Sequence, residues 1–160
     1  MTLEKRVEAL LEQCRTRKVR IATAESCTGG MVAALLTSIA GSSDVFECGF
    51  VTYSNESKRR LLGVPHEITS EFGAVSRACA LAMAHGAILE SAATLAVSIT
   101  GIAGPGGGSD EKPIGLVHFV CARRNGATQH REMRFGEIGR NAVRLASVEI
   151  ALEMLEAQVL

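Results

Sequence analysis

Apolar residues recur at two different spacings along the chain, and the alternation of these spacings predicts an α/β protein. Leu3, Val7 and Leu10 follow a helical spacing with charged residues between them, so the first segment is expected to be an amphipathic helix. Short runs rich in β-branched and aromatic residues are expected to be strands. The expected strands are 19–22, 45–54, 95–100, 114–122 and 127–135, and the expected later helices are 31–39, 56–62, 78–88 and one after residue 140.

Two of these segments carry information beyond their type. Residues 95–100 form an almost unbroken apolar run, which is typical of a strand buried on both faces of an α/β sheet. Residues 114–122 and 127–135 are joined through Asn125-Gly126, a dipeptide that favours a hairpin turn. The 160 residues are expected to form one domain, 1–160.

The charge balance argues against large anionic partners. Seventeen basic and seventeen acidic residues give a formal net charge of zero, so no broad positive surface for nucleic acid or an anionic membrane is expected. No apolar run reaches the roughly 18 residues of a membrane span, and residues 1–6 have no signal-peptide character. We therefore expect a cytoplasmic protein with a small ligand.

The cysteines and histidines are scattered. Five cysteines contain no C-x-x-C pair and have no histidine at metal-ligand spacing, so most are expected to be small buried apolar residues. We expect neither a metal site nor a cofactor.

The segment Thr23–Gly30 lies where the first expected strand passes into a helix. Unpaired N–H groups at a helix start suit an anion or a developing oxyanion, and Gly29 and Gly30 allow close approach to the backbone. Ser26, Cys27 and Thr28 are three candidate reactive or hydrogen-bonding side chains. The pattern alone leaves all three open.

Lys58 is expected in the first turn of the helix that follows the second strand. The helix dipole at that end, and partial burial, would both favour the uncharged amine, so Lys58 is a candidate general base. The alternative is an ordinary solvated lysine beside Arg59 and Arg60.

A second glycine-rich segment follows the third parallel strand. Five of the eight residues 101–108 are glycine, a composition that lets backbone N–H groups approach a ligand, although a flexible surface loop is the alternative. Arg140 and Arg144 begin the last helix and need negative partners, either a carboxylate or a substrate phosphate.

Polar or glycine-rich groups thus follow three strands, and ligands of open α/β sheets bind at the carboxyl ends of strands. No histidine lies at a comparable strand end, so a serine nucleophile at Ser26 would rely on Lys58 or Tyr53 as its base. Such an arrangement hydrolyses amides or esters, with N–H groups at the helix start after Ser26 receiving the oxyanion.

Five motifs together resemble the CinA C-terminal-domain family, which includes the nicotinamide mononucleotide amidases. They are Thr23-Ala-Glu-Ser-Cys-Thr-Gly-Gly30, Val51-Thr-Tyr-Ser-Asn-Glu-Ser-Lys58, Gly73-Ala-Val-Ser76, Thr100-Gly-Ile-Ala-Gly-Pro105 and Gly139-Arg140. The resemblance implies a three-layer α/β/α fold with a mixed, mostly parallel sheet. It also implies hydrolysis of nicotinamide mononucleotide to nicotinic acid mononucleotide and ammonia, and a stand-alone form of the domain.

The resemblance assigns Ser26 as nucleophile, with Lys58 and Tyr53 as proton-transfer partners. Substrate-binding residues are expected among Thr28, Gly29, Gly30, Thr100, Gly101, Arg140 and Arg144, and the phosphate is expected near the later glycines and arginines. A homo-oligomer, with a dimer favoured, is expected from the apolar helices. The alternatives are Cys27 as nucleophile, a non-catalytic nucleotide-binding or regulatory domain, and a purely structural domain.

Overall fold

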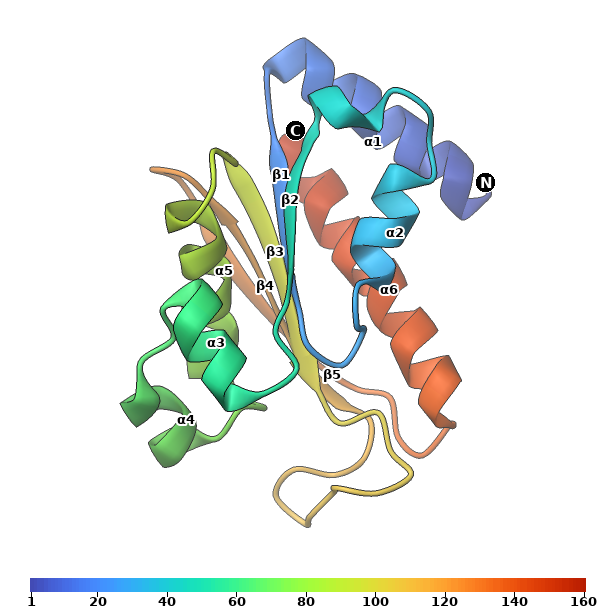
Figure 1. The fold of residues 1–160 in the computed structure, drawn as a ribbon. Coiled ribbons are helices and arrows are strands. Elements are labelled where there is room, and N and C mark those ends of the chain that lie inside the picture. Colours follow the sequence, from blue (N-terminus) through green and yellow to red (C-terminus); the bar gives the residue numbers. More distant parts are fainter.

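A five-stranded sheet with helices on both faces forms the centre of the molecule, which the computed structural model describes over residues 1–160 (Figure 1). This architecture confirms the α/β/α class. The strands are β1 Ile21–Glu25, β2 Phe46–Val51, β3 Leu95–Gly101, β4 Leu116–Arg123 and β5 Thr128–Arg134. The helices are α1 Leu3–Arg17, α2 Met31–Thr37, α3 Asn55–Leu62, α4 His66–Phe72, α5 Arg77–Leu89 and α6 Arg140–Val159, with a 3₁₀ turn at Ser42–Asp44.

The sheet is mixed, in the order β2-β1-β3-β4-β5. β1 pairs in parallel with β2 and β3, whereas β4 is antiparallel to both β3 and β5, so β4 alone runs against the other strands. This direction confirms the mostly parallel sheet. The carboxyl ends of β1, β2 and β3 therefore lie at the same end of the sheet. The polar motifs that follow these strands can then meet at one site.

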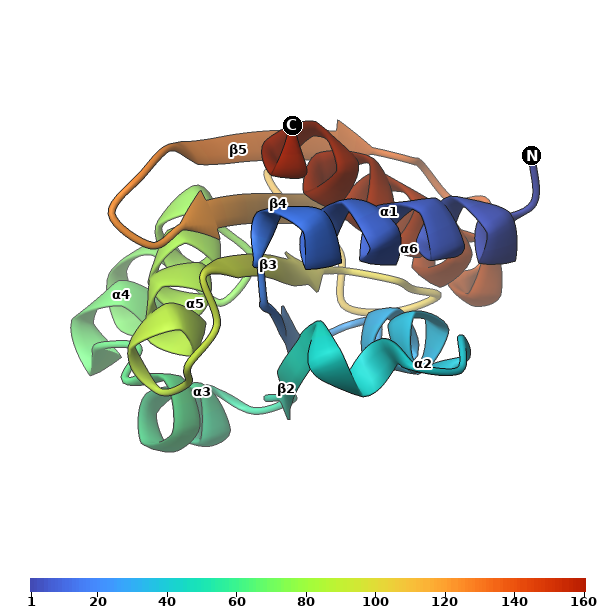
Figure 2. The ribbon, with the colours of Figure 1, turned by 90° about the horizontal axis from the view of Figure 1, so that it is seen from above.

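The helices form two layers, with α1, α2 and α6 on one face and α3, α4 and α5 on the other (Figures 1 and 2). Side chains of β3 alternate between the layers. Val97 and Ile99 join the larger core cluster, which also contains residues of α1 and α6, while Ala96 belongs to the cluster formed with α5. On the α5 side, Ser98 Oγ donates to Ala80 O at 2.7 Å. Small side chains on this face let α5 approach the sheet closely.

Helix α4 is absent from the sequence-based prediction. Its seven residues include only two apolar ones, Ile68 and Phe72, which is too few for a periodicity pattern to detect. The other helices lie where the pattern predicts them, within a few residues. None of the helices combines the length and the apolar character that crossing a bilayer demands.

Gly49, inside β2, allows a close approach between the sheet and α2. A Cβ there would lie 3.1 Å from Thr23 Oγ1 and 3.3 Å from Ala33 Cβ. The β1–β2 register also shifts between Ile21 and Ala22. Irregular pairing and close packing are common reasons for a glycine inside a strand.

Candidate active site

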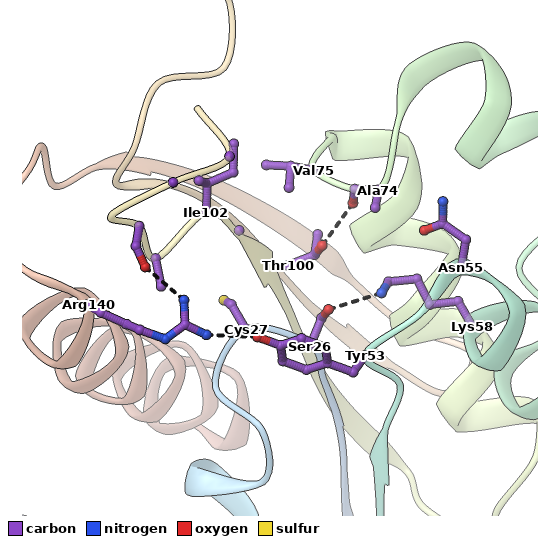
Figure 3. A pocket seen from close by; sticks show the side chains of 15 residues that line it. Ser26, Cys27, Tyr53, Asn55, Lys58, Ala74, Val75, Thr100, Ile102 and Arg140 are labelled. Atoms are coloured by element: carbon purple, nitrogen blue, oxygen red, sulfur yellow. Dashed lines mark hydrogen bonds between the residues drawn. The ribbon is translucent and has the colours of Figure 1, made fainter. Parts of the chain in front are cut away.

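A pocket of about 270 Å³ opens at the carboxyl ends of β1, β2 and β3 (Figure 3). Its walls come from the connections that follow these three strands, together with residues 74–75 before α5 and the start of α6. The volume lies near the lower end of the range for small-molecule sites. The three polar strand ends do converge on one cavity.

Ser26 lies one residue beyond the end of β1 and faces this cavity. Its N–H donates to Ile99 O of β3 at 2.9 Å, which fixes the backbone of the residue against the neighbouring strand. Its hydroxyl oxygen lies 3.0 Å from Lys58 Nζ (Figure 3). The serine thus has a potential base within hydrogen-bond distance.

Lys58 is directed into the protein by helix α3. A capping box starts this helix, because Ser54 Oγ accepts from the Ser57 N–H and Ser57 Oγ accepts from the Ser54 N–H. The Lys58 side chain is only 1% exposed, and its Nζ donates to Thr52 O at 2.7 Å. Lys58 is therefore not the solvated lysine of the alternative interpretation.

The surroundings of Lys58 favour its neutral form. Burial lowers the pKa of the Lys58 amine, and no salt bridge in the structure includes this residue. Burial is thus the leading cause of a shift that we expected in part from the helix dipole. A neutral amine can donate to Thr52 O and still accept the Ser26 proton.

Cys27 also lines the pocket but is a poorer candidate for the nucleophile. Its thiol is 6% exposed, and burial raises its pKa to about 11. A thiol with such a pKa stays protonated near neutral pH and is then weakly nucleophilic. The contact between Lys58 and Ser26 favours the hydroxyl.

Tyr53 forms part of the pocket wall, but its hydroxyl points to a different partner from the one expected. Arg140 Nη2 donates to Tyr53 Oη at 2.8 Å, and no hydrogen bond links Tyr53 to Ser26 or Lys58. Arg140 Nη1 donates to Gly104 O at 2.8 Å. Arg140 therefore joins the segment after β2 to the glycine-rich loop. Both of its partners are neutral oxygens, and neither is the carboxylate that was one of the two partners expected from the sequence.

Four of the expected substrate-binding residues do not line the pocket: Thr28, Gly29, Gly30 and Arg144. Thr28 is fully buried, and its hydroxyl donates to Glu25 Oε1 at 2.6 Å. Arg144 Nε donates to Cys27 O at 3.1 Å and its Nη2 to Thr28 O at 3.4 Å. These residues hold the turn that carries Ser26.

The start of α2 is not open to a ligand either, contrary to the expected oxyanion site. Glu25 Oε1 accepts from the Val32 N–H at 2.9 Å, and Oε2 accepts from the Ala33 N–H at 3.0 Å. A carboxylate of the protein itself thus occupies the helix N-terminus. Unpaired N–H groups remain in the turn between Ser26 and α2, where those of Cys27 and Thr28 have no partner in the protein.

Thr100 and Gly101 do line the pocket, with the loop that follows them. Thr100 Oγ1 donates to Ala74 O at 2.8 Å, which ties the end of β3 to the segment before α5. The N–H groups of Ala103, Gly104, Gly106, Gly107 and Gly108 have no acceptor in the protein. This loop offers several free donors to an anionic ligand.

Three lining residues were not predicted from the sequence to belong to the site: Asn55, Ala74 and Val75. Asn55 is three residues before Lys58, one helical turn away, and that spacing was a usable signal. Ala74 and Val75 belong to the Gly73–Ser76 motif of the family resemblance, to which no binding role was assigned. No group of three or more His, Cys, Asp or Glu side chains is arranged to hold a metal ion.

Comparison with known proteins decides the family. The model of the CinA C-terminal domain matches residues 3–159, nearly the whole chain. The chain belongs to the CinA C-terminal-domain family. The resemblance inferred from the five motifs is thereby confirmed.

Curated relatives within this family are of two lengths. Nicotinamide-nucleotide amidohydrolase PncC of Escherichia coli (strain K12) is 48% identical over 96% of this chain and 92% of its own length. A CinA-like protein of Synechococcus sp. is 49% identical over 94% of this chain but only 36% of its own length. The chain therefore spans about a third of the longer relatives.

Solved structures of the family have the same fold. The competence/damage inducible protein CihA from Agrobacterium tumefaciens is 55% identical, with a TM-score of 0.95 over 97% of this chain and 94% of that one. A CinA superfamily protein from Klebsiella pneumoniae 700603 is 34% identical, with a TM-score of 0.92 over 99% of this chain and 98% of that one.

Proposed function

We propose that this protein is a nicotinamide-nucleotide amidase that hydrolyses the carboxamide of nicotinamide mononucleotide with a Ser-Lys pair. The observation that carries the proposal is the 3.0 Å contact between Ser26 Oγ and the buried Lys58 Nζ. The relative from Escherichia coli whose length matches this chain is named a nicotinamide-nucleotide amidohydrolase. The chemistry of the pocket and the name of this relative agree.

In the first half of the reaction, neutral Lys58 accepts the Ser26 proton while Oγ attacks the carboxamide carbon. The tetrahedral oxyanion is stabilised by the unpaired N–H group of Cys27, which lines the pocket beside Ser26. The Lys58 ammonium returns its proton to the leaving nitrogen, the C–N bond breaks, and ammonia departs. Ser26 is left as an ester of the nicotinic acid group.

In the second half, water attacks the ester carbonyl while Lys58 again acts as the base. The ester C–O bond breaks, the Lys58 ammonium returns its proton to Ser26 Oγ, and nicotinic acid mononucleotide is released. We assign direct proton transfer between Ser26 and Lys58, because Ser26 Oγ lies 3.0 Å from Lys58 Nζ and neither group is hydrogen-bonded to Tyr53. A relay through Tyr53 would require its hydroxyl to come within hydrogen-bond distance of both groups.

The remaining groups of the pocket fit a mononucleotide. The free N–H groups of the glycine-rich loop and the Arg140 guanidinium can hold the phosphate, and the Tyr53 ring can pack on the pyridine. Binding of these distant parts would position the carboxamide at Ser26. Thr100 and Gly101 complete the wall beneath the loop.

Product analysis tests the function. The protein is incubated with nicotinamide mononucleotide, and nicotinic acid mononucleotide and ammonia are quantified, with the riboside and the dinucleotide as comparison substrates. Stoichiometric ammonia and acid from the mononucleotide are expected. Tight binding without product over a long incubation would instead favour the non-catalytic nucleotide-binding domain.

Two further expectations belong with this proposal. A homodimer is expected in solution, and size-exclusion chromatography with light scattering would reveal it. A cytoplasmic location is expected, which fractionation of the native cells would test.

A further inference from the structure

Glu25 is a buried carboxylate that the proposed reaction does not use. It is the last residue of β1, it is 0% exposed, and it forms no salt bridge. A buried carboxylate without a counter-ion is costly unless several donors satisfy it. The position of this buried carboxylate, directly before Ser26, therefore requires an explanation.

Three donors converge on this side chain. Thr28 Oγ1 lies 2.6 Å and the Val32 nitrogen 2.9 Å from Oε1, and the Ala33 nitrogen lies 3.0 Å from Oε2. Helix α2 has no side-chain cap of its own, because its N-cap is Gly30. Glu25 therefore caps a helix that begins six residues later. These bonds hold the start of α2, and with it the turn of residues 26–30, against the end of β1.

The backbone of Glu25 joins the nucleophile to the base. Its carbonyl accepts from the Thr52 N–H at 2.9 Å, and the Thr52 carbonyl in turn accepts from Lys58 Nζ at 2.7 Å. The next residue is Ser26, whose N–H is fixed to Ile99 O. One residue thus connects the turn, the nucleophile and the segment that holds the base.

Arg144 of α6 forms a second set of hydrogen bonds to the same turn. Arg144 holds the carbonyl of Cys27, and in a planar trans peptide the N–H of the following residue points the opposite way. The Thr28 N–H is therefore directed away from α6. Glu25 also binds the side-chain hydroxyl of Thr28, so the peptide plane between Cys27 and Thr28 has little freedom.

We propose that Glu25 is a positioning residue, which aligns Ser26 and the N–H groups that follow it by capping α2 and holding Thr28. The inference rests on the proposed Ser-Lys amidase function. Glu25 does not touch the substrate. Its effect is on the geometry of attack, where a displacement of about 1 Å can cost on the order of a hundredfold in rate.

Glu25→Gln is the most direct test. All three partners of the carboxylate are donors, so a glutamine must turn an NH₂ group towards at least one of them. We expect kcat to fall about 30-fold with KM changed less than about threefold. Glu156→Gln, which makes the same chemical change in a side chain bonded to Arg6, is the matched control.

Two readouts separate positioning from a general loss of structure. The rate at which a fluorophosphonate labels Ser26 should fall by a similar factor, and circular dichroism should show a folded protein. The pH at half-maximal kcat/KM should stay at the wild-type value, because the contacts of Lys58 are unchanged. A wild-type kcat, a loss confined to KM, or a loss explained by a smaller folded fraction would overturn the proposal.

Thr28→Val provides the test if Glu25→Gln fails to fold. It removes one donor and leaves the two backbone bonds of the carboxylate intact, so kcat and Ser26 labelling should fall about fivefold to tenfold at unchanged KM. Unchanged labelling of Ser26 in this folded variant would contradict the role. If the wild type releases no ammonia, the proposed function fails, but the labelling rates of the variants still test the positioning of Ser26.

Discussion

The turn after β1 and the loop after β3 follow adjacent parallel strands and both contain glycine, yet their backbones are used in opposite ways. In the turn, Arg144 binds the carbonyls of Cys27 and Thr28, and Glu25 binds the Thr28 hydroxyl and two N–H groups of α2. In the loop, the N–H groups from Ala103 to Gly108 have no acceptor in the protein. The first segment is therefore built to hold a reactive side chain still, and the second to receive a ligand.

This difference follows from where each backbone group is bonded and not from glycine content. Buried N–H and C=O groups are nearly always paired, so a run of unpaired groups beside a cavity indicates a place for another molecule. Gly29 and Gly30 adopt positive φ angles of 59° and 103°, which the tight turn requires. The glycines of the loop border the pocket itself.

The largest expected effect comes from removing the nucleophile from the rigid turn. Ser26→Ala should lower kcat at least about 10⁴-fold, because no other hydroxyl lies at hydrogen-bond distance from Lys58 Nζ. Cys27→Ala should lower it less than about tenfold. Ammonia release measured for both variants checks this, and the reverse order of effects would make Cys27 the nucleophile.

Replacement of the base should have the next largest effect. Lys58→Arg keeps a positive charge but cannot supply a neutral amine, so kcat should fall about 10³-fold. Steady-state assays with nicotinamide mononucleotide measure the loss. Activity close to that of the wild type would contradict the assignment of Lys58 as the base.

The pH profile of the wild type sharpens the same prediction. Because burial lowers the pKa of Lys58 from 10.5, kcat/KM should rise with pH and reach half its plateau below pH 10.5. A rate that falls with rising pH across this range would mean that the charged lysine is the active form.

Arg140 and Arg144 of α6 allow the loop and the turn to be compared directly, because Arg140 contacts the loop and Arg144 contacts the turn. Arg140→Ala should raise KM about 30-fold with a smaller change in kcat, because Arg140 borders the pocket and holds Gly104 O. Arg144→Ala should lower kcat about tenfold with little change in KM, because Arg144 holds the turn. If both variants changed the same kinetic constant, the proposed division of roles would be wrong.

Glycines of the loop should show a smaller effect of the same kind. Gly107 has φ +89° and a Cβ there would have room, so Gly107→Ala strains the backbone without a clash and should raise KM about fivefold. Gly106 has neither a positive φ nor a neighbour within 4 Å, and Gly106→Ala should raise KM less. Equal effects would indicate that the exact backbone conformation of the loop is unimportant.

The smallest effect concerns stability. The pKa of Lys58 is lower in the folded than in the unfolded chain, so between the two values only the unfolded chain binds the proton. The unfolding free energy of wild type minus that of Lys58→Met should therefore rise as pH approaches 10.5, by at most about 1.4 kcal/mol per pH unit. Urea titrations at several pH values measure this slope, and a flat or falling difference would contradict a lowered pKa.

The sequence predicted the strands and the meeting of three strand ends, which is where the proposed catalytic pair lies. Strand patterns and the polar groups that follow each strand place Ser26, Lys58 and Thr100 at one edge, and the structure brings them to one pocket. The burial of Lys58 could only be suggested, because a lysine beside two arginines resembles a solvated face. Helix α4 was missed because only two of its seven residues are apolar.

The roles of the polar residues around the turn could not be predicted from spacing. Thr28 and Arg144 lie near the reactive turn in the sequence pattern, but their bonds are to Glu25 and to backbone carbonyls. Spacing indicates which groups come close together and not which of them are already bonded. The same limit applies to Tyr53, whose bond to Arg140 joins residues 87 positions apart.

The position of β2 at the edge of the sheet affects how long the active geometry persists. β2 pairs only with β1, and the segment that follows it carries Thr52 and Lys58. Edge strands and their neighbours open locally at a lower free energy than central strands. Detachment of this strand would separate Lys58 from Ser26 while the central strands stayed folded. We therefore expect local opening of β2, and not global unfolding, to set the lifetime of the proposed active geometry.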